Sequence, residues 1–263
     1  YYGDENRPSN GKPGGAIFKF VPTKAYLGGA PPSVSDSPLA GGNVFGPRLG
    51  RRSGNTDFGQ GTETGLGTWI PLGAGPDLDL RAKAEPPPTG VGLTGFYRPE
   101  DLDVDLEAKK AGRVRFCGPM TGNETDAQLF GKVVCFSDGT LAQATANAAV
   151  PSAQDLVEGN PQFAMPDNIA YQPHGGYWIV HEDADTTYQG TGLGNHNNDL
   201  WSCLDDGRDD DLLTEGCIRI ATLRDLDAEW TGGIFDATGD HFYVSIQHNS
   251  SGTGVILDIT GWK

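Results

Sequence analysis

The chain has 263 residues and a formal net charge of −16, with 39 Gly and 18 Pro residues. This charge argues against nucleic acid and anionic membrane surfaces as partners, because both would repel it. It suits a protein that binds divalent cations, or one kept soluble by self-repulsion. No apolar run approaches the length of about 18 residues that a membrane span needs, and the Gly and Pro content favours many turns and short strands over long helices.

The N-terminal part contains few regular elements. After the charged turn GDENR we expect a strand over residues 16–21 (AIFKFV) and another over 67–72 (GTWIPL). The segment 28–67 is dominated by Gly, Pro, Ser and Asn and has hardly any apolar periodicity, which predicts a long irregular excursion. Residues 73–90 end in EPPPTG and predict another irregular connection, since Pro-Pro-Pro cannot continue a helix or a central strand.

Short strands recur at intervals in the rest of the chain. An acidic or polar residue, a strand, a turn and an aromatic-rich strand repeat in three segments, which begin near residues 99, 166 and 229. The segments are PEDLDVD…GRVRFCG, PDNIAYQPHGGYWIVHE and EWTGGIFDATGDHFYVSIQH. Paired antiparallel strands with this spacing predict an all-β chain folded as a β-propeller or part of one, with long Gly/Pro-rich loop insertions. A β-sandwich is the alternative.

We expect one propeller-like domain over residues 1–263, incomplete at its N-terminus, since the chain begins at Tyr1 without an initiator Met or a signal peptide. The helix signals are weak. They lie in DLDVDLEAKKAG (101–112) and in LRDLDAEW (223–230).

The four cysteines contain no CxxC pair, which argues against a zinc site. Cys203 and Cys217 flank a polar stretch typical of a hairpin tip, and Cys117 and Cys135 flank another turn-rich segment. Two disulfides of this kind predict an extracytoplasmic protein, either periplasmic or secreted. Four reduced, buried thiols are the alternative.

Acidic residues stand just before the first strand of each repeat: Glu100 and Asp101, Asp167, and Glu229. In a propeller the innermost strands converge on a central channel, so these carboxylates would meet there. Carboxylates that meet without a cation raise one another's pKa, and Ca²⁺, which takes six to eight oxygen ligands, relieves the repulsion. Asn168 and Asn195 are candidates for further oxygen ligands. The alternative is that each side chain caps a local turn.

Six short motifs in this order resemble the C-terminal half of the secreted PhoX-type alkaline phosphatases. They are GDENR with IFKFV, WIPL, RPEDLDVD, PDNIAYQPHGGYWIVHED, GNHNNDLW and EWTGGIFDATGDHFYVSIQHNSSG. The resemblance touches most of residues 1–27 and 67–263 and gives residues 28–67 no counterpart. It implies a β-propeller with calcium and iron in its central channel that hydrolyses phosphate monoesters.

The resemblance also implies metal ligands, mainly for calcium, at Asp4, Glu5, Glu100, Asp167, Glu182 and Glu229. Of these, Glu229 would approach the iron pair. The chain departs from the family pattern in two places. Asn6 stands where the family has the third acid of a G-D-D-E-R turn, and no segment resembles the T-C-E-E-N stretch that carries the iron-bridging cysteine. An iron site would therefore need the missing N-terminal half.

Two functional hypotheses follow. The first is a PhoX-like calcium- and iron-dependent phosphomonoesterase, represented here by a fragment or processed part, with its catalytic residues unassigned. The alternative is a non-catalytic calcium-binding β-propeller that serves as a structural or interaction subunit. Half a propeller exposes sheet faces, so in both cases we expect the missing half or a protein partner to cover them.

Overall fold

The computed structural model describes residues 1–7, 13–26, 28–30, 33–50, 64–75, 78–122, 130–184, 197–205 and 216–262. These residues form mainly antiparallel strands, together with α-helices of five residues and two short 3₁₀ helices. The prediction of an all-β chain is confirmed. None of the helices in the described ranges is long and apolar enough to cross a membrane.

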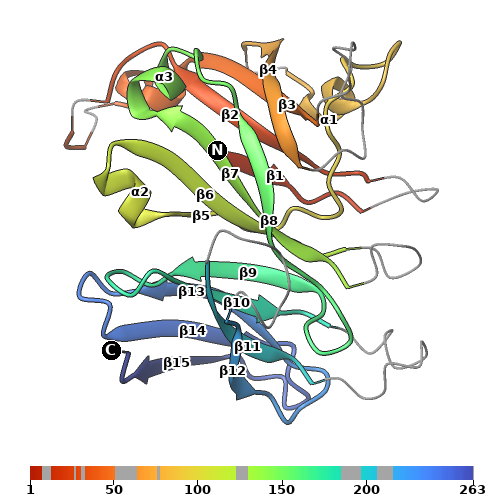
Figure 1. Cartoon of the computed structure of the whole chain (residues 1–263), viewed down its shortest axis with the longest axis vertical. Helices are drawn as coiled ribbons and strands as arrows, with labels where there is room; N and C mark the ends of the chain where they lie inside the picture. Colours follow the sequence, from red (N-terminus) through yellow and green to blue (C-terminus); the bar gives the residue numbers. More distant parts are fainter. Residues whose placement is uncertain are drawn as a thin grey trace.

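The strands are grouped into four antiparallel units, which we call blades A to D (Figure 1). Blade A contains β1 (Tyr2–Asp4), β2 (Ala16–Pro22), β3 (Gly42–Leu49) and β4 (Gly65–Gly73). Blade B contains β5 (Asp103–Val104), β6 (Arg113–Met120), β7 (Lys132–Thr140) and β8 (Ser152–Glu158). Blade C contains β9 (Pro166–Tyr171), β10 (Tyr177–Glu182), β11 (Asp199–Leu204) and β12 (Ile218–Thr222). Blade D contains β13 (Glu229–Phe235), β14 (His241–Gln247) and β15 (Val255–Thr260).

The first strands of the blades lie next to one another. β9 packs against both β5 and β13, and Gly3 of β1 lies against Pro99, which precedes β5, so closely that a Cβ atom would not fit. Blades A and B are also joined through their last strands, β4 and β8, into one curled eight-stranded sheet (Figure 1). Successive antiparallel units with adjacent first strands form a partial β-propeller, as the repeated hairpins predicted.

An apolar cluster closes each seam between neighbouring blades. The A/B cluster includes Ile17, Leu49, Phe96, Phe116 and Phe136; the B/C cluster includes Val133, Leu156, Tyr171, Trp178 and Trp201; the C/D cluster includes Ile179, Leu200, Trp230, Phe242 and Val244. Full burial of one such side chain contributes about 1.5–3 kcal/mol. The seams, and with them the relative positions of the first strands, are therefore held mainly by apolar packing.

The short helices are α1 (Leu80–Ala84), α2 (Leu106–Lys110), α3 (Leu141–Thr145), η1 (Val34–Asp36) and η2 (Pro38–Ala40). The helix signal in residues 101–112 is confirmed by α2, whose first turn is capped by Asp105. The signal in residues 223–230 is wrong, because those residues form turns that lead into β13.

The expectation of an irregular excursion over residues 28–67 is wrong for β3, and β4 also begins inside that range. Two residues conceal the strand in the sequence. Gly46 is needed because a Cβ atom there would collide with the side chain of Leu93. Pro47 interrupts the apolar alternation, and its carbonyl accepts a hydrogen bond from Thr94 N at 2.9 Å. Tertiary packing thus determines the strand where the local pattern does not.

Both predicted disulfides are present. Cys117–Cys135 joins β6 to β7, and Cys203–Cys217 joins β11 to the residue that precedes β12. The alternative of four reduced thiols is therefore wrong.

Candidate functional site

The adjacent first strands bring together acids from all four blades. Glu5 follows β1, Glu100 precedes β5, Asp167 lies in β9, and Glu229 begins β13. We call these four residues the acid cluster. Arg98 is its nearest cation, with Nε donating a hydrogen bond to Glu5 Oε1 at 2.8 Å. The convergence of repeated acids that the sequence predicted is therefore realised in the fold.

Glu100 is half-buried, and the charge of its carboxylate is only partly balanced by Arg98. Burial, the largest cause, and the neighbouring charge of Glu5 together raise the pKa of its carboxyl to about 7, against the opposing effect of Arg98. Its Oε2 atom is buried, and none of the described residues hydrogen-bonds it. A buried carboxylate oxygen without a partner is costly unless a proton or a cation satisfies it.

Asp167 is more deeply buried, with 6 % of its surface exposed. Burial is the largest cause that raises the pKa of its carboxyl, to about 8, and the charges of Glu100 and Glu229 add to the effect. Thr121 Oγ1 donates a hydrogen bond to Asp167 Oδ1 at 3.2 Å, which partly stabilises the ionised form. At neutral pH and without a cation, Asp167 therefore holds a proton.

Glu229 completes the cluster from blade D. Burial raises the pKa of its carboxyl, while Gln247 and His248 favour its ionised form. Gln247 Nε2 donates a hydrogen bond to Glu229 Oε1, and His248 Nε2 lies 3.2 Å from the same oxygen.

Two of the ligands expected from the family resemblance have other partners. Glu182 is fully buried, and its carboxylate accepts hydrogen bonds from Ala164 N (2.8 Å), Asp199 N (2.9 Å) and Trp201 Nε1 (3.1 Å). The strand pairing shifts register between His181 and Glu182, so this side chain does not follow the simple alternation of β10.

Asp4 forms an ion pair with Arg81, at 2.8 Å between Oδ1 and Nη2. Asn168 lies beside Asp167, but its amide oxygen accepts a hydrogen bond from Thr231 Oγ1 at 3.0 Å. Asn195 falls outside the described residues.

The sequence reasoning assigned no role to four residues that contact the cluster: Arg98, Thr121, Gln247 and His248. Arg98 and the Gln247–His248 pair lie within quoted motifs, R-P-E and V-x-I-Q-H, so their proximity to site acids was a usable signal. Arg98 also has a backbone φ of 57°, a region that a non-glycine residue rarely adopts. Nothing in the sequence around Thr121 marks it.

The donors of the acid cluster match a hard cation in chemistry, because they are carboxylate oxygens and one of them, on Glu100, has no hydrogen-bond partner among the described residues. In the described part of the chain, no three His, Cys, Asp or Glu side chains are close enough together to hold one ion. All four cysteines are in disulfides, so they supply no thiolate. The residues thus fit calcium in donor type and do not fit a thiolate-bridged iron centre.

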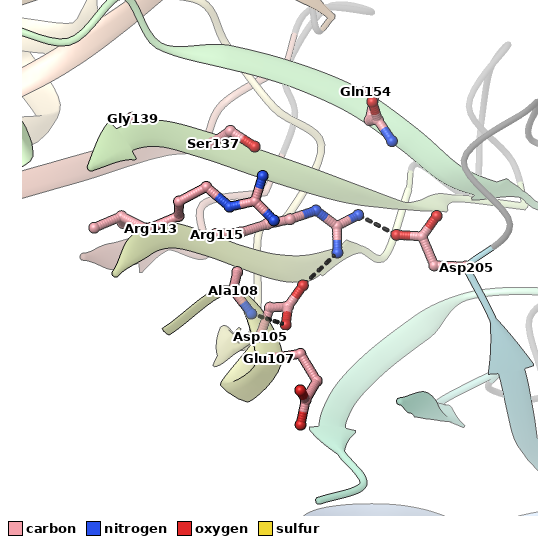
Figure 2. Close-up of a pocket in the computed structure, with 10 residues that line it drawn as sticks. Asp105, Glu107, Ala108, Arg113, Arg115, Ser137, Gly139, Gln154 and Asp205 are labelled. Carbon is pink, nitrogen blue, oxygen red and sulfur yellow. Dashed lines mark hydrogen bonds and ion pairs between the residues drawn. The ribbon is translucent and has the colours of Figure 1, made fainter. Parts of the chain in front are cut away.

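A second group of charges lies in an outer pocket of about 480 Å³ beside α2, β6 and β7. Figure 2 shows Arg115 between Asp105 and Asp205. Its Nη1 contacts Asp105 Oδ2 at 2.9 Å, and its Nη2 contacts Asp205 Oδ2. Here the acids are balanced by the arginine, in contrast to the acid cluster.

Comparisons with known proteins address the family and the fold. No curated protein sequence matches the chain. Among solved structures, the chain is similar to Pseudomonas fluorescens PhoX in complex with vanadate, a transition state analogue, with a TM-score of 0.65 and 19 % sequence identity. The match covers 98 % of this chain and 50 % of that one, so the chain spans about half the length of this solved relative. At this identity the likeness establishes the fold.

The family itself is established by sequence. The family model described as alkaline phosphatase PhoX matches residues 1–250, which is most of the chain and includes all four acids of the cluster. The chain therefore belongs to the PhoX alkaline phosphatase family.

Proposed function

We propose that the chain forms part of a metal-dependent phosphomonoesterase of the PhoX type, with the acid cluster at its catalytic centre. The observation that carries this proposal is the convergence of four carboxylates from four blades beside one arginine, with raised pKa values at Glu100, Asp167 and Glu229. Membership of the family gives the reaction class, and the solved relative was captured with vanadate, a transition state analogue.

The residues suggest a division of roles. Glu5, Glu100, Asp167 and Glu229 would hold calcium, and Asp167 would release its proton when the ion binds, because only the ionised carboxylate is a ligand. A bound cation supplies electrostatic stabilisation of charge on phosphoryl oxygens. Arg98 extends a planar guanidinium among these acids, a group whose geometry complements phosphate oxygens.

The proposal assigns no iron ligand to this chain. Because all four cysteines are in disulfides, this chain offers no bridging thiolate. Iron dependence would require ligands other than the residues described, and no step is assigned to iron.

The proposal includes a location and a covering partner. Two disulfides support an extracytoplasmic site, either periplasmic or secreted. On the face of blade D away from blade C, Ile234, Tyr243 and Ile256 are 67 %, 42 % and 76 % exposed. Strand register places these three side chains on one face, and we propose that the missing half or a protein partner covers it.

The test is hydrolysis of p-nitrophenyl phosphate by the purified chain with calcium, with and without added iron, together with metal analysis. We expect calcium-dependent hydrolysis that falls by about 100-fold or more in Asp167→Asn, since a metal ligand is lost. Glu107→Gln, which changes an exposed acid of the outer pocket, is the matched control and should retain activity.

The outcomes separate the hypotheses. Calcium binding without hydrolysis under any metal condition would favour the alternative, a non-catalytic calcium-binding propeller. Failure to bind calcium at all would overturn both.

A further inference from the structure

Strand β13 contains a bulge directly after its site acid. The pairing with β14 shifts register between Thr231 and Ile234, two residues beyond Glu229. Gly232 has a φ of 54°, and a Cβ atom on Gly233 would lie 2.6 Å from His181 Cε1. Bulges of this kind leave a backbone group outside the ladder and redirect nearby side chains.

Asn168 of the neighbouring strand β9 forms hydrogen bonds with two residues of the bulge. Its Oδ1 atom accepts a hydrogen bond from Gly232 N at 2.5 Å and another from Thr231 Oγ1 at 3.0 Å. Its Nδ2 atom lies 3.4 Å from Asp167 Oδ2, at the limit of a hydrogen bond. An amide oxygen has two acceptor sites, and both are used here.

The contacts of Asn168 therefore join two neighbouring site acids. One acid, Asp167, precedes it in the chain and is touched by its amide nitrogen. The other, Glu229, stands at the start of the strand whose bulge the amide oxygen holds. A shift in this link would change the separation of the two carboxylates.

A similar contact joins blade B to blade C. Asp101, which follows the site acid Glu100, accepts a hydrogen bond from Ile169 N of β9 at 3.2 Å. Asp103 accepts another from Tyr171 N at 2.7 Å. In both places the residue after a site acid holds the backbone of the next blade.

We propose that Asn168 is a positioning residue, rather than a metal ligand, which sets the separation of Asp167 and Glu229 through the β13 bulge. This inference deepens the proposed function and rests on it for the role of the acids in binding cations. It replaces the expectation that Asn168 supplies a ligand oxygen.

The first measurement needs no metal. In the chelator-treated protein, amide hydrogen exchange reports directly on the hydrogen bond from Gly232 N to Asn168 Oδ1. Amide exchange of Gly232 should accelerate in Asn168→Ala and stay protected in Asn168→Asp, which keeps the acceptor oxygen.

The second measurement is calcium affinity by calorimetry. We expect Asn168→Ala to weaken binding by about tenfold, the effect typical of residues that orient metal ligands. Asn160→Ala is the matched control, since Asn160 Oδ1 also accepts two backbone hydrogen bonds, from Gln162 N (2.8 Å) and Phe163 N (3.3 Å), away from the acids. It should lower the melting temperature without changing the amide exchange of Gly232 or the calcium affinity.

The inference is overturned if Asn168→Ala leaves the amide of Gly232 as protected as in Asn160→Ala, whether calcium affinity is unchanged or, as loss of a direct ligand would cause, abolished. A wild-type chain that binds no calcium would overturn the metal part of the proposed function alone, because the amide exchange of Gly232 tests the link between Asn168 and the bulge without metal.

Discussion

The acid cluster and the outer pocket both contain carboxylates beside an arginine, but the negative charge is balanced only in the outer pocket. In the outer pocket, Arg115 contacts Asp105 and Asp205, so two carboxylates share one guanidinium at the junction of blades B and C. In the acid cluster, Arg98 hydrogen-bonds Glu5 and its charge acts on the other three acids, which leaves an excess of three negative charges if all four are ionised.

The difference teaches how to separate functional from structural acids. The outer pocket is complete with its own residues, and its ion pairs tie two blades together. The acid cluster is not balanced by its own residues. The pKa values of Glu100 and Asp167 are raised, and Glu100 Oε2 has no hydrogen-bond partner among the described residues, so protons or a cation are needed to neutralise the group. Each prediction below changes one of the two groups and leaves the other intact.

The largest effect is expected from pH and Asp167. Its folded pKa of about 8 lies above the ordinary 3.8, so the folded chain binds a proton that the unfolded chain releases. Without divalent cations, stability should therefore fall as pH rises from about 4 to about 8, by at most about 5 kcal/mol. Asp167→Asn should remove most of this dependence and be the more stable form at pH 8, as measured by urea unfolding with chelator present. Equal pH slopes for the two proteins would contradict the assignment.

Arg115→Met should destabilise the chain by about 2–3 kcal/mol in the same assay. The variant removes the guanidinium that two largely buried carboxylates contact, with side-chain exposures of 12 % and 17 %. Arg113→Met is the matched control, since Arg113 is exposed on the same strand and lines the same pocket. Similar losses in both variants would show that the ion pairs do not account for the effect.

Calcium should stabilise the wild-type chain by about 2.7 kcal/mol at a concentration 100 times its dissociation constant. Glu229→Gln should lose most of this gain, because an amide replaces a carboxylate ligand. Arg115→Met should keep the full gain, whatever its own stability. Differential scanning calorimetry with and without calcium measures both, and a gain retained in Glu229→Gln would remove that residue from the site.

The smallest effect is expected at the exposed rim of the outer pocket. Lys110 and Glu107 form an ion pair with side chains 56 % and 55 % exposed. Lys110→Ala should change stability by no more than about 0.5 kcal/mol, since exposed pairs are solvated and screened. A larger loss in the urea assay would mean that accessible charges matter more in this protein than burial suggests.

Much of the fold and the centre of the site could be predicted from the sequence. The acid-strand-turn-strand repeats correspond to the first two strands of blades B, C and D, and their leading acids do converge. The disulfides followed from the flanking of hairpin tips. These features are local, because a strand, a turn and the residue before them are all encoded within about twenty residues.

The failures depended on tertiary contacts. β3 was missed because its Gly46 makes room for Leu93, a residue distant in sequence. Glu182 stays a predicted ligand from the family resemblance, and in the structure its carboxylate accepts hydrogen bonds from Ala164 N and Trp201 Nε1. Arg98 lies beside Glu100 in the R-P-E motif, but its hydrogen bond to Glu5 forms only when blades A and B meet.

The two disulfides have a consequence for how the molecule would come apart. Cys117–Cys135 closes blade B within itself, and Cys203–Cys217 does the same for blade C, so neither crosses a seam. The covalent links thus lie within blades, while the junctions between blades depend mainly on apolar contact, together with the β4–β8 pairing and the Arg115–Asp205 ion pair. Under mechanical pulling from the two ends, the oxidised chain should extend in discrete steps, with seams separating first and a shortened contour length retained inside blades B and C.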